Sequence, residues 1–343
     1  MAVSWSAGAM RVLVLGGTGW LGGEIVRAAL GRGHEVVCMA RGSRPAPLGA
    51  ALIAADRDDP QAYSALTGVF DAALELTSRP DHAQGAVTAL RGRVRRWALV
   101  STCSVYAQDD IPAQDEAAPL LPAWEGPFEL EKYGECKVAC ERAVLTAYDD
   151  ALIARPGLIT GPGDRSDRTG YWPLRFAHPA DAEGAVLVPD SAGASVQLID
   201  VRDLARWLVE SVERGTPGVF NTTTEHVPFA EYLALAGQVA GHTGELVAVD
   251  QDWIAAHGIA PWAGDRSFPL WLPQPDYAGF ATRSPAAARA AGLRTRPLAD
   301  SIRDTLAWEL QAGPGRARRA GLSPADELTL LAEARSSTGH ETH

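Results

Sequence analysis

The feature that most constrains the fold is a glycine-rich turn that directly follows a short apolar run. Residues 12–15 read Val-Leu-Val-Leu, which is typical of a strand buried on both faces. Gly16, Gly19 and Gly22 follow at the spacing G-x-x-G-x-x-G. The next residues, 21–30, have the pattern of a helix. This order brings backbone amides and a helix N-terminus to the end of a strand, where a pyrophosphate binds. The segment predicts a dinucleotide site formed by Gly16, Thr18, Gly19, Trp20, Leu21 and Gly22.

Apolar segments alternate with helical patterns along the rest of the first half. Because strands that alternate with helices form parallel sheets covered on both faces, the sequence predicts an α/β protein. We expect a Rossmann-type doubly wound parallel sheet and a smaller C-terminal substrate lobe. The further strands are expected at residues 34–40, 51–55, 72–76, 97–100 and 151–154. The expected divisions are an N-terminal extension (1–9), a dinucleotide-binding domain (10–160, its sheet completed by parts of 190–225), a mainly substrate-binding lobe (161–335) and a disordered tail (336–343).

The second half is less regular. Residues 201–213 and 229–241 have helical patterns, whereas 252–280 is rich in tryptophan and proline and predicts a packed loop with aromatic anchors. Ser284 and Ser323 are each followed by proline, and this pair is typical of a helix start.

The end of the second strand indicates which nicotinamide cofactor binds. NAD enzymes usually place a carboxylate there to hold the ribose hydroxyls. This chain has Ala40, followed by Arg41 and Arg44. Guanidinium groups bind a 2′-phosphate in a bidentate manner, so NADP(H) is favoured and NAD(H) stays possible. The alternative is that both arginines are solvated loop residues. Asp56, after the third strand, is expected either to bind the adenine amino group or to form a turn.

Tyr133 and Lys137 are four residues apart and therefore share one face of a helix. Leu130, Cys140 and Val144 continue the same stripe, so both polar side chains are expected to point inward. A free phenol has a pKa of about 10, and a neighbouring ammonium together with a nicotinamide cation would lower it. The pair therefore predicts an acid/base group. The alternative is a surface pair that stabilises the helix.

The ordered motifs resemble those of the extended short-chain dehydrogenase/reductase family. The resemblance rests on the glycine motif at 16–22, the strand at 71–76, the S-T-x-x-V-Y segment at 101–106, Tyr133 to Lys137, Arg155 to Gly157, and residues 197–203.

This resemblance implies a catalytic triad. Thr102 would hydrogen-bond the substrate oxygen, and Tyr133 would pass a proton to or from it. Lys137 would bind the nicotinamide ribose and depress the pKa of the tyrosine. The alternative for Thr102 is a hydroxyl that caps the next turn. Further cofactor contacts are expected from Thr77, Ser78 and Pro156.

Two positions depart from the family pattern. Dehydratases of the family have Asp-Glu after the threonine, but Cys103 and Ser104 stand here, so no carboxyl is present to drive elimination. Glu75 ends the fourth strand, where the family usually carries a histidine before leucine-alanine-alanine.

Substrate contacts are expected from two loops. Trp124 and Phe128 lie in the long loop between Thr102 and Tyr133. Arg168 and Trp172 follow the sixth strand, together with Asp164, Arg165 and Tyr171, and a solvated loop with one packed tryptophan is the equal alternative. For Trp262 and Trp271 core packing is favoured over a place in the wall of the substrate pocket. His82, His178 and His226 show no ligand spacing and are not expected to be catalytic.

The sequence thus predicts an NADP(H)-dependent oxidoreductase that acts on a carbonyl or secondary alcohol of a small metabolite. The alternatives are a nucleotide-sugar epimerase that retains NAD and a non-catalytic dinucleotide-binding regulator. A net charge of −11 disfavours nucleic acid as a partner. No run approaches the roughly 20 apolar residues of a membrane span. Four cysteines without paired metal-ligand spacing predict no metal and a reducing compartment, the cytoplasm. The resemblance makes a homodimer plausible.

Overall fold

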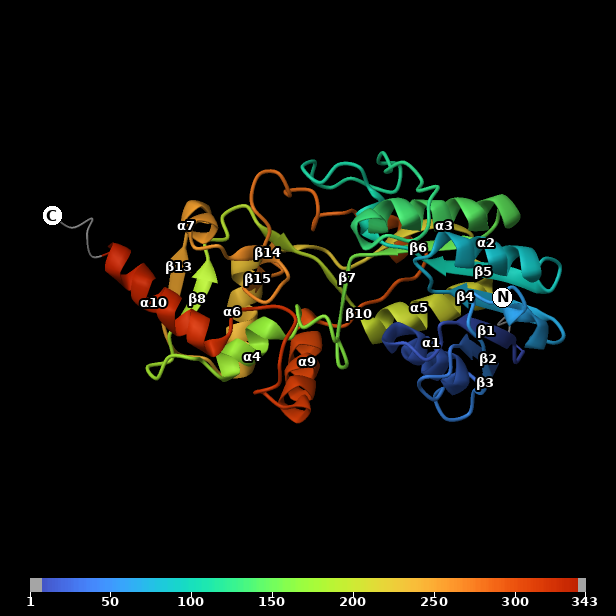
Figure 1. The fold of residues 1–343 in the computed structure, drawn as a ribbon, viewed down its shortest axis with the longest axis horizontal. Helices are drawn as coiled ribbons and strands as arrows, with labels where there is room; N and C mark the ends of the chain where they lie inside the picture. The colour runs from blue at the N-terminus through green and yellow to red at the C-terminus, as the bar shows by residue number, and fades with distance from the viewer. Residues whose placement is uncertain (1–7, 339–343) are drawn as a thin grey trace, which may run out of the picture.

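A seven-stranded parallel sheet forms the centre of the N-terminal lobe, on the right in Figure 1. The computed structural model describes residues 8–338. The sheet confirms the predicted Rossmann-type doubly wound architecture. Its strands lie in the order β11 (Gly218–Thr222), β6 (Leu152–Pro156), β5 (Val94–Val100), β4 (Phe70–Glu75), β1 (Arg11–Leu15), β2 (Glu35–Ala40) and β3 (Ala51–Ala54).

Two pairs of helices cover the sheet, which explains why residues 12–15 of β1 are all apolar. Val12 and Val14 pack with α1 (Trp20–Gly31) and α5 (Val201–Arg214) on one face. Leu13 and Leu15 pack on the opposite face with α2 (Pro80–Ala89) and α3 (Tyr133–Ala147). Successive side chains of a strand point to opposite faces, so a strand covered on both sides needs apolar residues at every position.

The turn from β1 into α1 requires glycine at two positions. Gly16 has a φ of 102°, in the left-handed region that side chains disfavour. A Cβ atom on Gly22 would lie 2.2 Å from the carbonyl oxygen of Gly16. The helix can therefore approach the strand closely only because this position has no side chain.

The C-terminal lobe, on the left in Figure 1, has its own core rich in aromatic side chains. Trp172 lies at its centre, with Phe268 stacked at 5.8 Å between ring centroids. The lobe is built from α4 (Tyr171–Ala177), β8 (Val186–Pro189), α6 (Phe229–Ala240), β13 (Leu246–Val249), α7 (Gln251–Ala256), β14 (Ala260–Trp262), β15 (Ser267–Pro269), α9 (Leu298–Ala312) and α10 (Pro324–Thr338).

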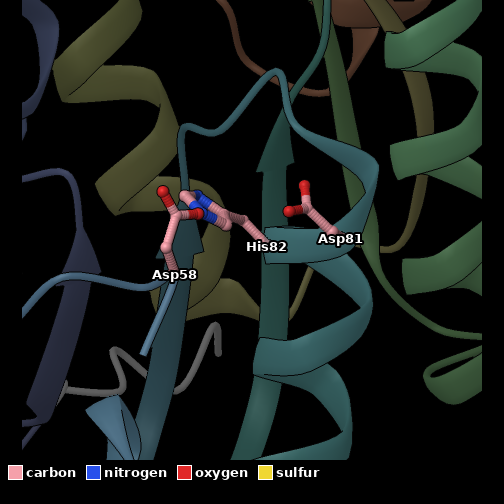
Figure 2. Close-up of side chains that lie close together, drawn as sticks. All are labelled: Asp58, Asp81 and His82. Carbon is pink, nitrogen blue, oxygen red and sulfur yellow. The ribbon is translucent and has the colours of Figure 1, made fainter. Parts of the chain in front are cut away.

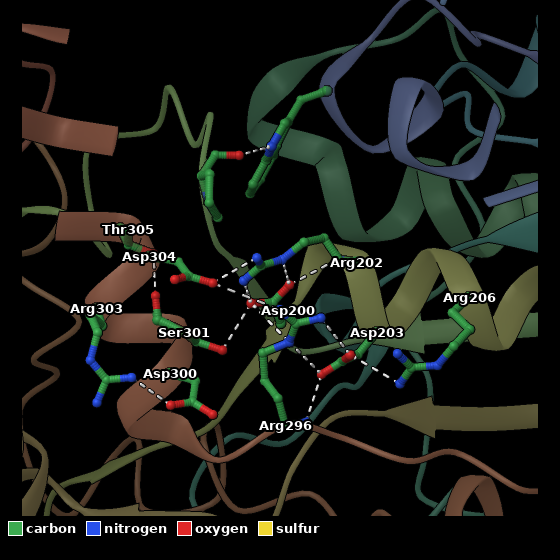
Figure 3. Close-up of polar contacts among 12 residues, drawn as sticks. Asp200, Arg202, Asp203, Arg206, Arg296, Asp300, Ser301, Arg303, Asp304 and Thr305 are labelled. Atoms are coloured by element: carbon green, nitrogen blue, oxygen red, sulfur yellow. Dashed lines mark hydrogen bonds and ion pairs between the residues drawn. The ribbon is translucent and has the colours of Figure 1, made fainter. Parts of the chain in front are cut away.

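Short strand pairs and an ion-pair network join the two lobes. β7 (Leu158–Thr160) pairs with β10 (Leu198–Asp200), and β9 (Ser195–Val196) pairs with β12 (Val227–Pro228). Figure 3 shows the network around Asp200 at the start of α5. The carboxylate of Asp200 accepts hydrogen bonds from the Arg202 side chain and, at 2.9 Å, from Ser301 of α9. This buried carboxylate therefore fixes α9 against the N-terminal lobe.

Several segments differ from the sequence prediction. Residues 252–280 contain α7, β14 and β15 instead of one packed loop. Ser323 caps α10 by accepting a hydrogen bond from the amide of Asp326, but α8 (Ala286–Ala290) begins one residue later than predicted and packs on the N-terminal lobe. Helix α10 continues to Thr338, so the expected tail is helical at its start. The rest of that tail and residues 1–7 of the expected extension lie outside the described residues.

No helix within residues 8–338 is long and apolar enough to span a bilayer.

Two neighbouring glycines of α1 provide a matched test of the turn. We expect Gly22→Ala to lower the free energy of unfolding by about 1–3 kcal/mol, because the new methyl group meets backbone atoms that cannot move aside. A Cβ on Gly23 would lie no closer than 3.6 Å to another atom, so Gly23→Ala should raise it by about 0.5–1 kcal/mol. Urea unfolding followed by circular dichroism measures both, and equal effects would contradict the proposed packing constraint.

Candidate active site

One cavity of about 1280 Å³ lies where the strands of the main sheet end. Residues at the carboxyl ends of β1 to β6 line it on one side, and residues of the 161–170 loop and of the C-terminal lobe line it on the other. Doubly wound sheets bind their ligands at this edge. The wall includes these residues predicted from the sequence: Gly16, Thr18, Gly19, Trp20, Leu21, Gly22, Arg41, Arg44, Asp56, Thr77, Ser78, Thr102, Tyr133, Lys137, Pro156 and Arg168.

The first turn of α1 fits a pyrophosphate. Gly19 is its N-cap and provides no side-chain hydrogen bond. Within the described part of the chain, the amides of Trp20, Leu21 and Gly22 have no hydrogen-bond acceptor, and all three residues line the cavity. Amides without a partner at a helix N-terminus form a site for an anion. The residues present therefore fit a dinucleotide cofactor.

Trp20 also connects this turn to the far wall. Its indole Nε1 donates a hydrogen bond of 2.8 Å to the carbonyl of Pro162, in the loop that follows β7. This contact holds the start of that loop beside the glycine turn.

The adenosine end of the cavity carries the two predicted arginines. Arg41 and Arg44 are exposed, line the cavity after β2, and form no ion pair within residues 8–338. Asp56 also lines this end, and its Oδ1 accepts a hydrogen bond of 3.2 Å from the amide of Asp58. Asp56 thus stabilises a turn, which was one of the two roles expected for it, and it also lines the cavity.

Tyr133 is the first residue of α3 and reaches the cavity beside Thr102 and Ser78. Burial raises the pKa of the phenol, whereas hydrogen bonding with Thr102 and Ser78 and the charge of Arg168 lower it. The net direction is upward. Desolvation of the phenolate outweighs the groups of the chain that stabilise it, and the lowering expected from the sequence also depends on the charge of a nicotinamide ring.

Lys137 lies one helical turn after Tyr133 and is only 2% exposed. Its Nζ donates hydrogen bonds of 2.8 Å to the carbonyl of Thr77 and 2.5 Å to the carbonyl of Val100. Burial lowers the pKa of this ammonium. The pair is thus directed inward and is not a surface pair, and Lys137 ties α3 to the ends of β4 and β5.

Thr102 caps a short turn, one of the two roles considered for it, and it also lines the cavity. As N-cap of a short 3₁₀ turn over Cys103–Val105, its Oγ1 accepts a hydrogen bond of 3.1 Å from the amide of Ser104. The same hydroxyl interacts with Tyr133 in the cavity wall. The capping bond fixes the orientation of a side chain that also faces the ligand site.

Glu75, the departure from the family pattern, is wholly buried and has a partner that the sequence did not reveal. Arg57, which follows β3, donates to both of its carboxylate oxygens at 2.8 and 2.6 Å. Glu75 also accepts a hydrogen bond of 2.9 Å from the amide of Thr77, whose carbonyl binds Lys137. The unusual carboxylate thus helps to position the residue whose carbonyl accepts a hydrogen bond from Lys137.

Figure 2 shows a cluster of Asp58, Asp81 and His82. Asp58 and His82 belong to the cavity wall. Within residues 8–338, the cluster is the group of acidic and histidine side chains that could hold a metal ion, because the possible ligand atoms all lie within 4.8 Å of one another. Arg79 pairs with both carboxylates at 2.8 Å, and His82 Nε2 lies 2.8 Å from Asp58. Because a cation already occupies this exposed acidic group, we assign it no metal.

The structure corrects the predicted roles of several aromatic residues. Trp172 is fully buried in the core of the C-terminal lobe, where its Nε1 donates to the carbonyl of Pro269, so the predicted substrate contact is wrong. Trp124 lies outside the cavity wall, whereas Phe128 of the same loop belongs to it. Trp262, which was expected in the core, lines the cavity instead, while Trp271 is buried in the core as predicted.

Helix geometry explains why Trp172 is buried in the core of the C-terminal lobe. Helix α4 begins at Tyr171, and the first side chains of this helix turn into the lobe. Sequence reasoning also missed Phe280 and Arg319 in the cavity wall. No local motif marks them, since only the packing of the C-terminal lobe brings them to the site.

Comparison with known proteins agrees with this geometry. The sequence model of the NAD dependent epimerase/dehydratase family matches residues 12–84 and 81–222. The chain is 31% identical over 261 residues to 2′-dehydrokanamycin reductase of Streptomyces kanamyceticus, covering 72% of this chain and 71% of that protein. It is 30% identical over 176 residues to 2-alkyl-3-oxoalkanoate reductase of Stenotrophomonas maltophilia (strain K279a), covering 46% of this chain and 53% of that protein.

Solved structures share the fold at lower sequence identity. The structure of UDP-glucose 4-epimerase from Thermus thermophilus in complex with NAD has a TM-score of 0.63 and 19% identity, covering 88% of this chain and 100% of that chain. The match of the family model over more than half of the residues identifies the chain. It belongs to the NAD dependent epimerase/dehydratase family, within the extended short-chain dehydrogenases/reductases.

Proposed function

We propose that the protein is an NADP(H)-dependent oxidoreductase that transfers hydride to or from a carbonyl or secondary alcohol of a small metabolite. The observation that carries this proposal is the position of the Tyr133 hydroxyl. It lies beside Thr102 and Ser78 in the wall of the cavity, one helical turn from the buried ammonium of Lys137.

Each residue of the triad has a separate task in this reaction. The bound nicotinamide supplies or accepts the hydride. Thr102 donates a hydrogen bond to the substrate oxygen and orients it. Tyr133 donates its phenolic proton to that oxygen during reduction and accepts it during oxidation. Burial raises the pKa of Tyr133, and the protonated phenol is the form that donates to the substrate oxygen during reduction.

The named relatives support a reductase, and the family contains epimerases as well. An epimerase oxidises and reduces the same carbon and retains its cofactor, usually NAD. Arg41 and Arg44 at the end of β2, with no carboxylate at position 40, favour NADP(H) and count against this alternative. Stoichiometric NAD⁺ in the purified protein would reverse the order of the two functions.

Elimination is disfavoured by the residues next to Thr102. Cys103 and Ser104 occupy the positions at which dehydratases of the family carry acidic groups. A non-catalytic regulator is disfavoured for a related reason, since the whole triad lies in the cavity wall. The four cysteines are free, buried thiols, which supports the proposed cytoplasmic location.

The proposed cofactor preference depends on two exposed arginines. We expect the double variant Arg41→Ala, Arg44→Ala to weaken NADPH binding by about 10- to 100-fold, because charged hydrogen bonds to the 2′-phosphate are lost. NADH binding should change little, since it has no such phosphate. Dissociation constants from titration calorimetry measure both effects. Tighter binding of NADH than of NADPH by the unmodified protein would contradict the preference.

The proposed acid/base role depends on one hydroxyl. We expect Tyr133→Phe to lower kcat by about 10²- to 10⁴-fold, the usual contribution of a positioned acid or base, while cofactor binding is retained. Tyr148→Phe is the control, because Tyr148 ends the same helix outside the cavity wall. Stopped-flow measurement of NADPH oxidation with an accepted carbonyl substrate gives the rates. Unchanged turnover in Tyr133→Phe would require another proton donor.

A further inference from the structure

The side of the cavity opposite the main sheet holds a guanidinium group that forms no ion pair within residues 8–338. Arg168 lines the cavity in the loop after β7, and its Nε donates a hydrogen bond of 3.2 Å to Ser166 Oγ. No carboxylate within residues 8–338 forms an ion pair with it. Its guanidinium carbon lies 5.0 Å from the centroid of the Trp262 ring. The side chain is thus oriented by its neighbours and not neutralised by them.

The nearby acidic group is already engaged. Asp164 is buried and accepts hydrogen bonds from the amide and hydroxyl of Ser166 and, at 2.8 Å, from the hydroxyl of Thr169. Two further cavity residues on this side, Arg165 and Arg319, form no ion pair within the described chain. A protein with a net charge of −11 therefore presents positive charge at this end of its cavity.

Burial of such a cation is unfavourable unless a ligand compensates it. Burial lowers the pKa of Arg168, whereas the charge of Asp164 raises it. The charge of Arg168 also lowers the pKa of Tyr133, so it acts on the proposed acid/base group. An anion bound here would recover the desolvation cost of the guanidinium and would lie near the reacting carbon.

Part of the remaining wall on this side is apolar and aromatic. Trp262 and Phe280 meet edge to face, with ring centroids 5.1 Å apart. Phe128 and Leu270 extend the same surface. The site therefore combines a planar cation held over an indole ring with a wall that suits a hydrocarbon or aromatic group.

We propose that the substrate is an oxo acid, or the corresponding hydroxy acid, whose carboxylate is bound by Arg168. The planar fork of the guanidinium matches the two oxygens of a carboxylate. The apolar part of the substrate lies against Trp262 and Phe280. This inference rests on the proposed function, since it names the class of carbonyl compound that the site would reduce.

The test compares acids with their neutral esters. Binding of 3-hydroxyhexanoate and 3-hydroxy-3-phenylpropanoate, each beside its methyl ester, is measured by titration calorimetry on the full chain with NADP⁺ present. We expect the acids to bind about 10- to 100-fold more tightly than the esters, the usual effect of a charge-assisted hydrogen-bond pair. Arg168→Met should abolish this difference. Arg142→Met is the matched control, because Arg142 is exposed on α3 and lies outside the cavity wall.

The outcomes separate this inference from the proposed function. Binding of neither acid, equal affinity for acids and esters, or an acid preference that survives in Arg168→Met would overturn the inference. Tighter binding of phenyl phosphate than of either acid would overturn the choice of a carboxylate. Because binding is measured without turnover, an acid preference that depends on Arg168 would support the site even if no hydride transfer were found. Reduction of neutral ketones alone would support the proposed function and overturn the inference.

Discussion

The site depends on one buried charge. The ammonium of Lys137 is enclosed by protein and hydrogen-bonded to the carbonyls of Thr77 and Val100, at the ends of two neighbouring strands. A buried cation without such partners is strongly destabilising, so the two bonds fix the position of α3 against the sheet edge. Tyr133 lies one turn earlier on the same rigid helix. Its hydroxyl is thereby placed at the carboxyl edge of the sheet, next to the side chain of Thr102.

A buried ion pair between Arg57 and Glu75 supports this arrangement. Glu75 accepts two hydrogen bonds from the Arg57 guanidinium and one from the amide of Thr77. The backbone of Thr77 is therefore held on one side by Glu75 and provides its carbonyl to Lys137 on the other. Removing either partner of such a pair would leave an uncompensated charge in the interior. The carboxylate that departs from the family pattern is thus integrated into the support of the lysine.

The arginines at the two ends of the cavity are opposite in sign to the net charge of the chain. The chain is acidic, yet arginines without ion pairs in residues 8–338 lie at both ends of its cavity: Arg41 and Arg44 at the adenosine end, Arg168 on the substrate side. Cations in a concave, partly desolvated site attract anions more strongly than the same cations on an open surface. This distribution fits the two anionic groups proposed above, one on the cofactor and one on the substrate.

Local sequence determined the fold class, the glycine turn and the triad. The apolar run at 12–15, the glycines that follow it and the spacing of Tyr133 and Lys137 are short-range patterns, and each acts through neighbours along the chain. Only the tertiary structure placed Trp262 in the cavity and Trp172 in the core, and only it paired Arg57 with Glu75. The physical reason is that segments far away in the sequence decide whether a tryptophan is buried or lines a cavity. They also decide which residue pairs with a buried charge. Those segments meet only when two lobes and seven strands are packed together.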